Sequence, residues 1–263
     1  MRLVLCYLFL ASLVGARFAH AETINIAAAI SMKEALVDAE VAFSKETGDD
    51  VEFSFGASGV LLTQIKNGAP IDGFISAAAE QVDALDKAQL TVAGTRRVVA
   101  MNALVMIVPA ASKLRLTSIK DIARDDVKKI AVGQPKSVPA GQYAMQTLAS
   151  LKLDTAVGGK IVNGANVRQV LDYVQRGEVD AGFVYATDAQ QIGDRVKIIA
   201  TAPADSHDPI VYPGVLIASS KKQALTGKFF TFLASRQGRQ ILERHGFIID
   251  MPTTRPTTQA TGK

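Results

Sequence analysis

Along most of the chain, short segments with the two-residue period of a strand alternate with longer segments that have the period of a helix. Residues 23–28 alternate as a strand, and in residues 32–46 apolar positions such as Leu36 and Phe43 recur at helical spacing. Predicted strands cover 23–28, 51–55, 71–76, 98–109, 129–133, 160–162, 180–185, 196–200 and 210–218. Predicted helices cover 32–46, 60–66, 80–88, 118–124, 141–151, 167–176, 222–234 and 237–245.

This alternation predicts α/β layers with mainly parallel sheets. Two long extended segments, 98–109 and 210–218, bracket the middle of the chain. They suggest two crossovers between two lobes, with lobe one at residues 22–100 and 213–250 and lobe two at residues 101–212. The length of the chain also allows one large α/β domain, and periodicity by itself leaves that alternative open.

The two ends of the chain differ from the rest in composition. Arg2 precedes an apolar run too short to cross a bilayer, and Ala19-His20-Ala21 has the small-x-small pattern of a signal-peptidase site. The pattern predicts a secretory signal peptide at residues 1–21 and a mature protein in the periplasm. Residues 251–263 are rich in Thr and Pro without apolar periodicity, which predicts a disordered tail.

Composition and charge exclude several function classes. Cys6, the only cysteine, lies inside the predicted signal peptide, so the mature chain has neither disulfides nor cysteine-bound metal. Removal of Arg2 and Arg17 with the signal peptide lowers the formal net charge from +4 to about +2. Because no long block of like charges occurs, nucleic acid is not an expected partner.

At four places a strand ends in small residues and a helix follows, at 27–31, 55–59, 138–141 and 164–167. A helix start leaves backbone N–H groups without intrahelical acceptors and carries partial positive charge, so small residues there let an anion approach. Ordinary capping is the alternative at each place. Ser31 with Glu34 fits a capping box, Asn166 is a good N-cap and Pro139 suits a first turn.

The sequence offers little for catalysis. His207 and His245 are the only histidines of the predicted mature chain, and no Ser-His-Asp arrangement accompanies either of them. Asp72, Asp180 and Asp188 are expected in turn or cap roles rather than as a carboxylate set. Neither of the common glycine-rich phosphate-binding motifs occurs.

Six segments, in order, resemble periplasmic molybdate-binding proteins, and the resemblance covers nearly the whole predicted mature chain, up to residues 246–247. The segments are IAAAIS (26–31), FGASG (55–59), GAPIDGFISA (68–77), AVG (131–133), VPAGQYA (138–144) and VYATDA (184–189). The resemblance implies a two-lobed type II periplasmic binding protein fold, each lobe a mostly parallel sheet flanked by helices, with the ligand in the cleft between the lobes.

The same resemblance implies the ligand contacts, namely Ser31 and Ser58 from lobe one and Ala140, Val167 and Tyr185 from lobe two. The serines and the tyrosine would donate through hydroxyls, and Ala140 and Val167 through their backbone N–H groups. Molybdate at neutral pH is a fully deprotonated dianion that only accepts hydrogen bonds, so a site of donors suits it. Molybdenum would be held as its oxyanion, with no direct metal ligand and no cofactor.

The implied function is capture of molybdate, and of tungstate, by a monomer that delivers it to the membrane permease of an ABC importer. Sulfate is the alternative ligand, because it has the same charge and shape. An enzyme would need an acid–base pair at the cleft, and a transcription regulator would need a DNA-binding helix pair in place of the signal peptide. Departures from the family pattern at Ile30, Gly59 and Gly73 affect no implied contact.

Overall fold

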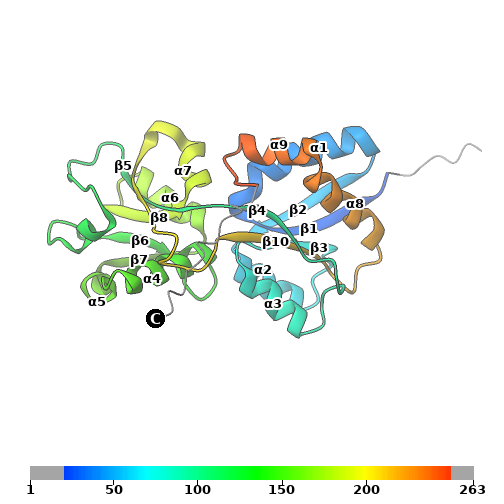
Figure 1. The fold of residues 1–263 in the computed structure, drawn as a ribbon, viewed down its shortest axis with the longest axis horizontal. Helices are drawn as coiled ribbons and strands as arrows, with labels where there is room; N and C mark the ends of the chain where they lie inside the picture. The colour runs from blue at the N-terminus through cyan, green and yellow to red at the C-terminus, as the bar shows by residue number, and fades with distance from the viewer. Residues whose placement is uncertain (1–20, 250–263) are drawn as a thin grey trace, which may run out of the picture.

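The computed structural model describes residues 21–249. Most of the predicted signal peptide and the predicted C-terminal tail lie outside these residues. Figure 1 shows two lobes side by side, each a sheet with helices on both faces. The type II two-lobed fold is therefore present, and one cluster of buried apolar side chains extends through both lobes.

The lobe-one sheet has the strand order β2-β1-β3-β10-β4. Strand β1 pairs in parallel with β2 and β3, whereas β10 runs antiparallel to both β3 and β4. The sheet is therefore mixed, with one strand opposed to the other four. The bounds are β1 (Thr23–Ala29), β2 (Asp50–Gly56), β3 (Gly73–Ile75), β4 (Arg97–Met101) and β10 (Val211–Leu216).

The lobe-two sheet repeats this plan with the order β7-β6-β8-β5-β9. Strand β6 pairs in parallel with β7 and β8, and β5 runs antiparallel to β8 and β9. In both lobes the opposed strand lies next to a crossover, which is why the sheets are less parallel than the sequence suggests. The bounds are β5 (Leu104–Pro109), β6 (Ile130–Gly133), β7 (Ile161–Gly164), β8 (Ala181–Tyr185) and β9 (Val196–Thr201).

Helices pack on both faces of each sheet because the connections between parallel strands must return across it. In lobe one they are α1 (Lys33–Thr47), α2 (Ser58–Lys66), α3 (Ala79–Lys87), α8 (Gln223–Ala234) and α9 (Arg236–Arg244), preceded by the 3-10 turn η1 (Ile30–Met32). In lobe two they are α4 (Pro139–Ser150), α5 (Asp154–Val157), α6 (Val167–Gln175) and α7 (Ala186–Ile192), with the 3-10 turns η2 (Ile119–Ala123), η3 (Gly158–Lys160) and η4 (Gly193–Arg195).

The chain passes between the sheets twice, between Met101 and Leu104 and between Thr201 and Val211. The prediction of one strand over 98–109 is wrong, because this apolar run is two strands in different sheets. Strand β5 is almost entirely buried, whereas β4 buries only Ala100 and exposes Arg97 and Val98, so the apolar run in the sequence does not correspond to one buried strand. Met101, Val211 and Tyr212, all predicted in lobe two, lie instead in strands of the lobe-one sheet. The remaining lobe limits stay a prediction.

Candidate functional site

A small cavity lies between the lobes where two helix starts of lobe two face two turns of lobe one. All five residues that the sequence comparison proposes line it. Its walls are Ala29, Ile30, Ser31, Gly56, Ala57, Ser58, Ala77, Val138, Pro139, Ala140, Val167 and Tyr185. The space open to the centre of a water molecule is about 10 Å³. This is close to the minimum for one buried water, so the walls of the two lobes lie close together at this point.

Ser58 begins α2, one residue after Ala57, and its side chain is buried. Its hydroxyl oxygen accepts a hydrogen bond from the Ala77 N–H at 3.0 Å. Since a backbone N–H can only donate, this bond leaves the hydroxyl hydrogen of Ser58 for an acceptor in the cavity.

Ser31 lies inside the 3-10 turn η1 and is also buried. Its hydroxyl is 3.0 Å from the Tyr212 hydroxyl. The predicted capping box is wrong, because the Ser31 side chain makes no cap bond and Glu34 pairs with Arg168 of lobe two at 2.7 Å. The S-x-x-E spacing fits a capping box, but both side chains interact instead with residues that are distant in the sequence.

Ala140 and Val167 stand at the starts of α4 and α6. Pro139 is the first residue of α4 and has no N–H, so Ala140 supplies the first donor of that helix. Asn166 caps α6 as predicted, since its side chain accepts from the Gln169 N–H at 3.0 Å. That bond leaves the Val167 N–H for a ligand. Both helices direct the positive ends of their dipoles at the cavity.

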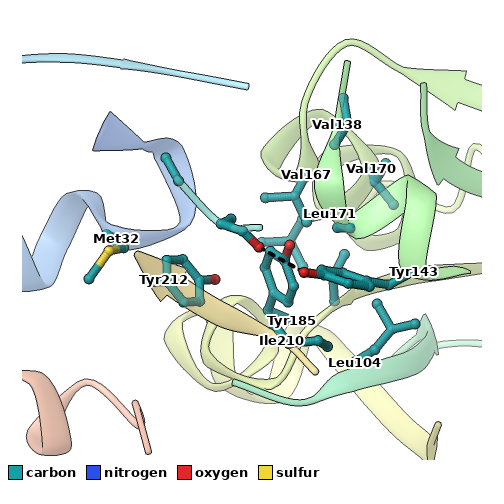
Figure 2. Close-up of a cluster of buried hydrophobic side chains, with 14 of the residues drawn as sticks. Met32, Leu104, Val138, Tyr143, Val167, Val170, Leu171, Tyr185, Ile210 and Tyr212 are labelled. Atoms are coloured by element: carbon teal, nitrogen blue, oxygen red, sulfur yellow. Dashed lines mark hydrogen bonds between the residues drawn. The ribbon is translucent and has the colours of Figure 1, made fainter. Parts of the chain in front are cut away.

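Tyr185, the last residue of β8, presents a phenol that is fully buried. Among the described residues its hydroxyl has no hydrogen-bond partner. Burial raises the pKa of this phenol well above its ordinary range, with smaller contributions from Tyr212 and Tyr143, so it stays protonated. Figure 2 shows Tyr185 beside Val167 and Tyr212. A buried hydroxyl without a partner costs free energy, which an acceptor in the cavity would recover.

Replacing Tyr185 by Phe should weaken binding of the anion by about 10- to 100-fold, the worth of one charge-assisted hydrogen bond. The unliganded variant should unfold at the same or a higher temperature, because an unpaired buried hydroxyl is gone. Calorimetric titration and thermal unfolding measure the two effects. Tyr173→Phe, which removes a phenol outside the cavity, is the control. Unchanged affinity in Tyr185→Phe would place the phenol outside the site.

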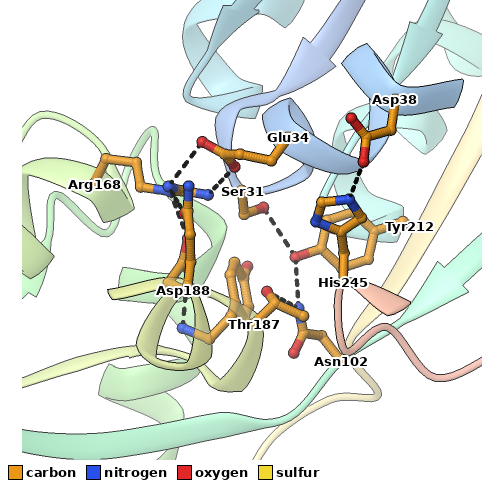
Figure 3. A network of polar contacts seen from close by, with 11 residues as sticks. Ser31, Glu34, Asp38, Asn102, Arg168, Thr187, Asp188, Tyr212 and His245 are labelled. Atoms are coloured by element: carbon orange, nitrogen blue, oxygen red, sulfur yellow. Dashed lines mark hydrogen bonds and ion pairs between the residues drawn. The ribbon is translucent and has the colours of Figure 1, made fainter. Parts of the chain in front are cut away.

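Among the described residues, no acidic or basic side chain lines the cavity. The nearest charged cluster lies behind it, where Arg168 bridges Glu34 of lobe one and Asp188 of lobe two, each at 2.7 Å (Figure 3). Burial raises the pKa of Asp188 to about 7, although Arg168 opposes the shift. Burial also acts on Glu34, but hydrogen bonding to Gln191 and the Arg168 charge outweigh it and lower the pKa of that carboxyl.

Asp188 links this cluster to the site. Its other carboxylate oxygen accepts from the Tyr185 N–H at 3.3 Å, at the start of α7. The predicted cap role of Asp188 is thereby confirmed. The carboxylates of Asp72 and Asp180 also accept hydrogen bonds from backbone N–H groups, those of Asn25 and Lys129 respectively. No sequence signal pointed to Arg168, because its partners are distant along the chain.

The described residues contain no group of three or more His, Cys, Asp or Glu side chains that could hold a metal ion. His245 lies at the end of α9, as predicted, and also pairs with Asp38 at 2.8 Å. His207 is partly buried in the loop before β10, and its ring nitrogen is 2.7 Å from the Asp208 carbonyl oxygen. Neither histidine lines the cavity.

The lobes touch directly at the rim of the cavity. The Gly59 N–H donates to the Ser137 carbonyl oxygen at 2.9 Å, and a Cβ at Gly59 would lie 2.7 Å from the Ser137 Cα. Tyr143 donates to the Ala77 carbonyl oxygen at 3.4 Å, also across the cleft. Gly59, one of the departures from the family pattern, is therefore required for this close approach of the two lobes.

Two similar lobes that enclose a small cavity lined by hydrogen-bond donors define a protein that captures a small ligand between its lobes. The chain belongs to the bacterial extracellular solute-binding protein family, whose sequence model matches residues 24–248. It is therefore a solute-binding protein rather than an enzyme.

Named relatives agree with this assignment. The molybdate-binding protein ModA of Haemophilus influenzae is 37% identical over 238 residues, covering 89% of this chain and 93% of the relative. The structure of the periplasmic molybdate-binding protein of Azotobacter vinelandii is 26% identical, with a TM-score of 0.77 over 87% of this chain and 100% of that one. The sulfate-binding protein SubI of Mycobacterium tuberculosis shares the fold at 18% identity, with a TM-score of 0.73 over 87% and 86% of the two chains.

Proposed function

We propose that this protein captures molybdate, and by the same chemistry tungstate, in the cavity between its lobes and delivers it to the membrane permease of an ABC importer. The observation that carries the proposal is the donor-only lining: two serine hydroxyls, one unpaired phenol and two helix starts meet around a space for one small ligand. Ser31, Ser58, Ala140, Val167 and Tyr185 are the proposed contacts. The names of the relatives support the choice of oxyanion.

The lining suits the charge of a fully deprotonated dianion. Each charge-assisted hydrogen bond contributes about 1.5–3 kcal/mol, and a carboxylate on the wall would repel the anion. Neutral donors and helix dipoles supply attraction without a full positive charge. An anion that carries a proton, such as hydrogen phosphate, would need one of the three hydroxyls as an acceptor for that proton, and that hydroxyl would then donate no hydrogen bond to the anion at that oxygen.

The setting of this function is part of the proposal. The predicted signal peptide would send the chain to the periplasm, where it would act as a monomer without a cofactor. In the part of the chain that the structure describes, no helix is long and apolar enough to cross a membrane. Closure of the lobes on the anion would bend the two crossovers, since the five contacts come from both lobes.

Calorimetric titration of the mature protein with molybdate, tungstate, sulfate and phosphate tests the proposal. We expect molybdate and tungstate to bind at micromolar concentration or tighter, and sulfate at least about 100-fold more weakly. Phosphate should give no binding heat. Sulfate binding as tightly as molybdate would instead support the sulfate alternative, because the two anions differ mainly in size. Absence of binding by all four anions would overturn the proposal.

A further inference from the structure

Behind Ser31, a chain of buried polar side chains leads away from the cavity to the two crossovers (Figure 3). Tyr212, at the start of β10, lies 3.0 Å from the Ser31 hydroxyl. Asn102, between β4 and β5, approaches the Tyr212 hydroxyl at 3.3 Å. All three residues are buried, so the direction of each hydrogen bond affects which groups remain available to a ligand.

The orientation of the Asn102 amide follows from its neighbours. Its oxygen accepts from the Ala103 N–H at 2.9 Å, and a backbone N–H can only donate. Its nitrogen therefore faces the other way and donates both hydrogens, one to the Thr187 hydroxyl at 2.9 Å and one to the Tyr212 hydroxyl. Asn102 thus acts on Tyr212 as a donor.

The direction of the hydrogen bond from Asn102 fixes the direction of the hydrogen bond between Tyr212 and Ser31. Because the phenol oxygen accepts from Asn102, its own hydrogen needs an acceptor, and the Ser31 oxygen is the one within reach. Burial raises the pKa of Tyr212, so the phenol keeps the hydrogen that it donates. Ser31 then accepts from Tyr212, and its own hydrogen remains for the cavity. The hydroxyl of Ser58 is oriented in the same way: it accepts a hydrogen bond from the Ala77 N–H, and its own hydrogen remains for the cavity.

We propose that Asn102 and Tyr212 are positioning residues for the oxyanion: Asn102 donates to Tyr212, Tyr212 donates to Ser31, and Ser31 is thereby held as a donor to the ligand. This inference rests on the proposed function. It also explains how a serine, which can donate or accept, becomes a selective contact for a fully deprotonated anion. Tyr212 packs edge-on against Tyr185, with ring centroids 5.9 Å apart, so it also orients a second proposed contact.

Two substitutions test the donor chain by titration calorimetry with molybdate. Tyr212→Phe removes only the hydroxyl, and it should weaken binding by about tenfold, the worth of one hydrogen bond. Asn102→Asp keeps the shape, but an ionised carboxylate accepts from Tyr212 and turns the phenol hydrogen away from Ser31. We expect its affinity to be lower by about 100-fold at pH 8. Tyr173→Phe should bind as the wild type does.

The pH profile separates positioning from a general structural effect. At pH 5.5 the buried carboxyl that Asn102→Asp introduces takes up a proton and can donate again, so the ratio of wild-type to variant affinity should fall toward one. The same ratio for Tyr212→Phe should stay constant with pH. Affinities of both variants within twofold of the wild type at every pH would overturn the donor chain. If wild-type protein binds none of the four oxyanions, the proposed function itself fails. Tyr212→Phe keeps the test decisive should Asn102→Asp not fold.

Discussion

Replacing Ser58 by Asp is expected to abolish molybdate binding, with an affinity loss of more than about 1,000-fold. Ser58 is buried on the cavity wall at the start of α2. A carboxylate there would face a dianion, and at 4 Å with an effective dielectric constant of 20 each pair of unit charges repels by about 4 kcal/mol. A dianion doubles that repulsion, which exceeds any hydrogen bond that the substitution removes. Titration calorimetry measures the loss.

Two further substitutions at the same position isolate the charge. Ser58→Asn has nearly the size of Asp without its charge, and Ser58→Ala removes only the hydroxyl, for an expected loss of about 10- to 100-fold. The difference between the Asp and Asn variants reports the repulsion alone. If Ser58→Asp bound molybdate within tenfold of Ser58→Asn, Ser58 would not face the ligand, and the proposed set of contacts would be wrong.

Replacing Arg168 by Met is expected to destabilise the unliganded protein by about 1–2 kcal/mol near pH 8 and by more at higher pH, because it leaves the buried carboxylate of Asp188 without its partner and that carboxyl can take up a proton instead. Asp188 is fully buried and lies in the same lobe as Arg168, so the pair does not depend on closure. The loss of the ion pair between Arg168 and Glu34 costs less free energy, because Glu34 is partly exposed and lies in the other lobe. Urea unfolding of the unliganded variant measures the change, with Arg176→Met as the exposed control.

The destabilisation should depend on pH in a defined direction. Burial already raises the pKa of Asp188 to about 7, and removal of Arg168 raises it further. Between the pKa of Asp in the unfolded chain, about 4, and the raised pKa, the folded state binds more protons, so stability falls as pH rises. Below about pH 7 Asp188 is protonated in both folded proteins, so the deficit of Arg168→Met should be small near pH 4 and should grow as the pH rises from about 7 toward the higher pKa of the variant. Adding Asp188→Asn should restore most of the stability; a pH-independent deficit would contradict this account.

Local sequence rules account for the surroundings of Val167 but not for those of Ser31. The helix start at Val167 and its Asn166 cap follow from local rules, and the structure has both. For Ser31 the same rules predict a capping box with Glu34, but the structure gives each side chain a different partner. Local patterns report which backbone groups need partners. They do not report that a distant side chain will provide a better one.

The amino-acid sequence by itself determined the order of strands and helices, the four helix starts rich in small residues and the resemblance to a family. These features depend on periodicity and on contacts within a few residues. The tertiary structure alone decided the size of the cavity, the unpaired phenol of Tyr185 and the bond between Ser31 and Tyr212, 181 positions apart. It also split the apolar run 98–109 between two sheets. The physical reason is that two sheets, joined by only two crossovers, bring together side chains whose separation in sequence carries no signal of their contact.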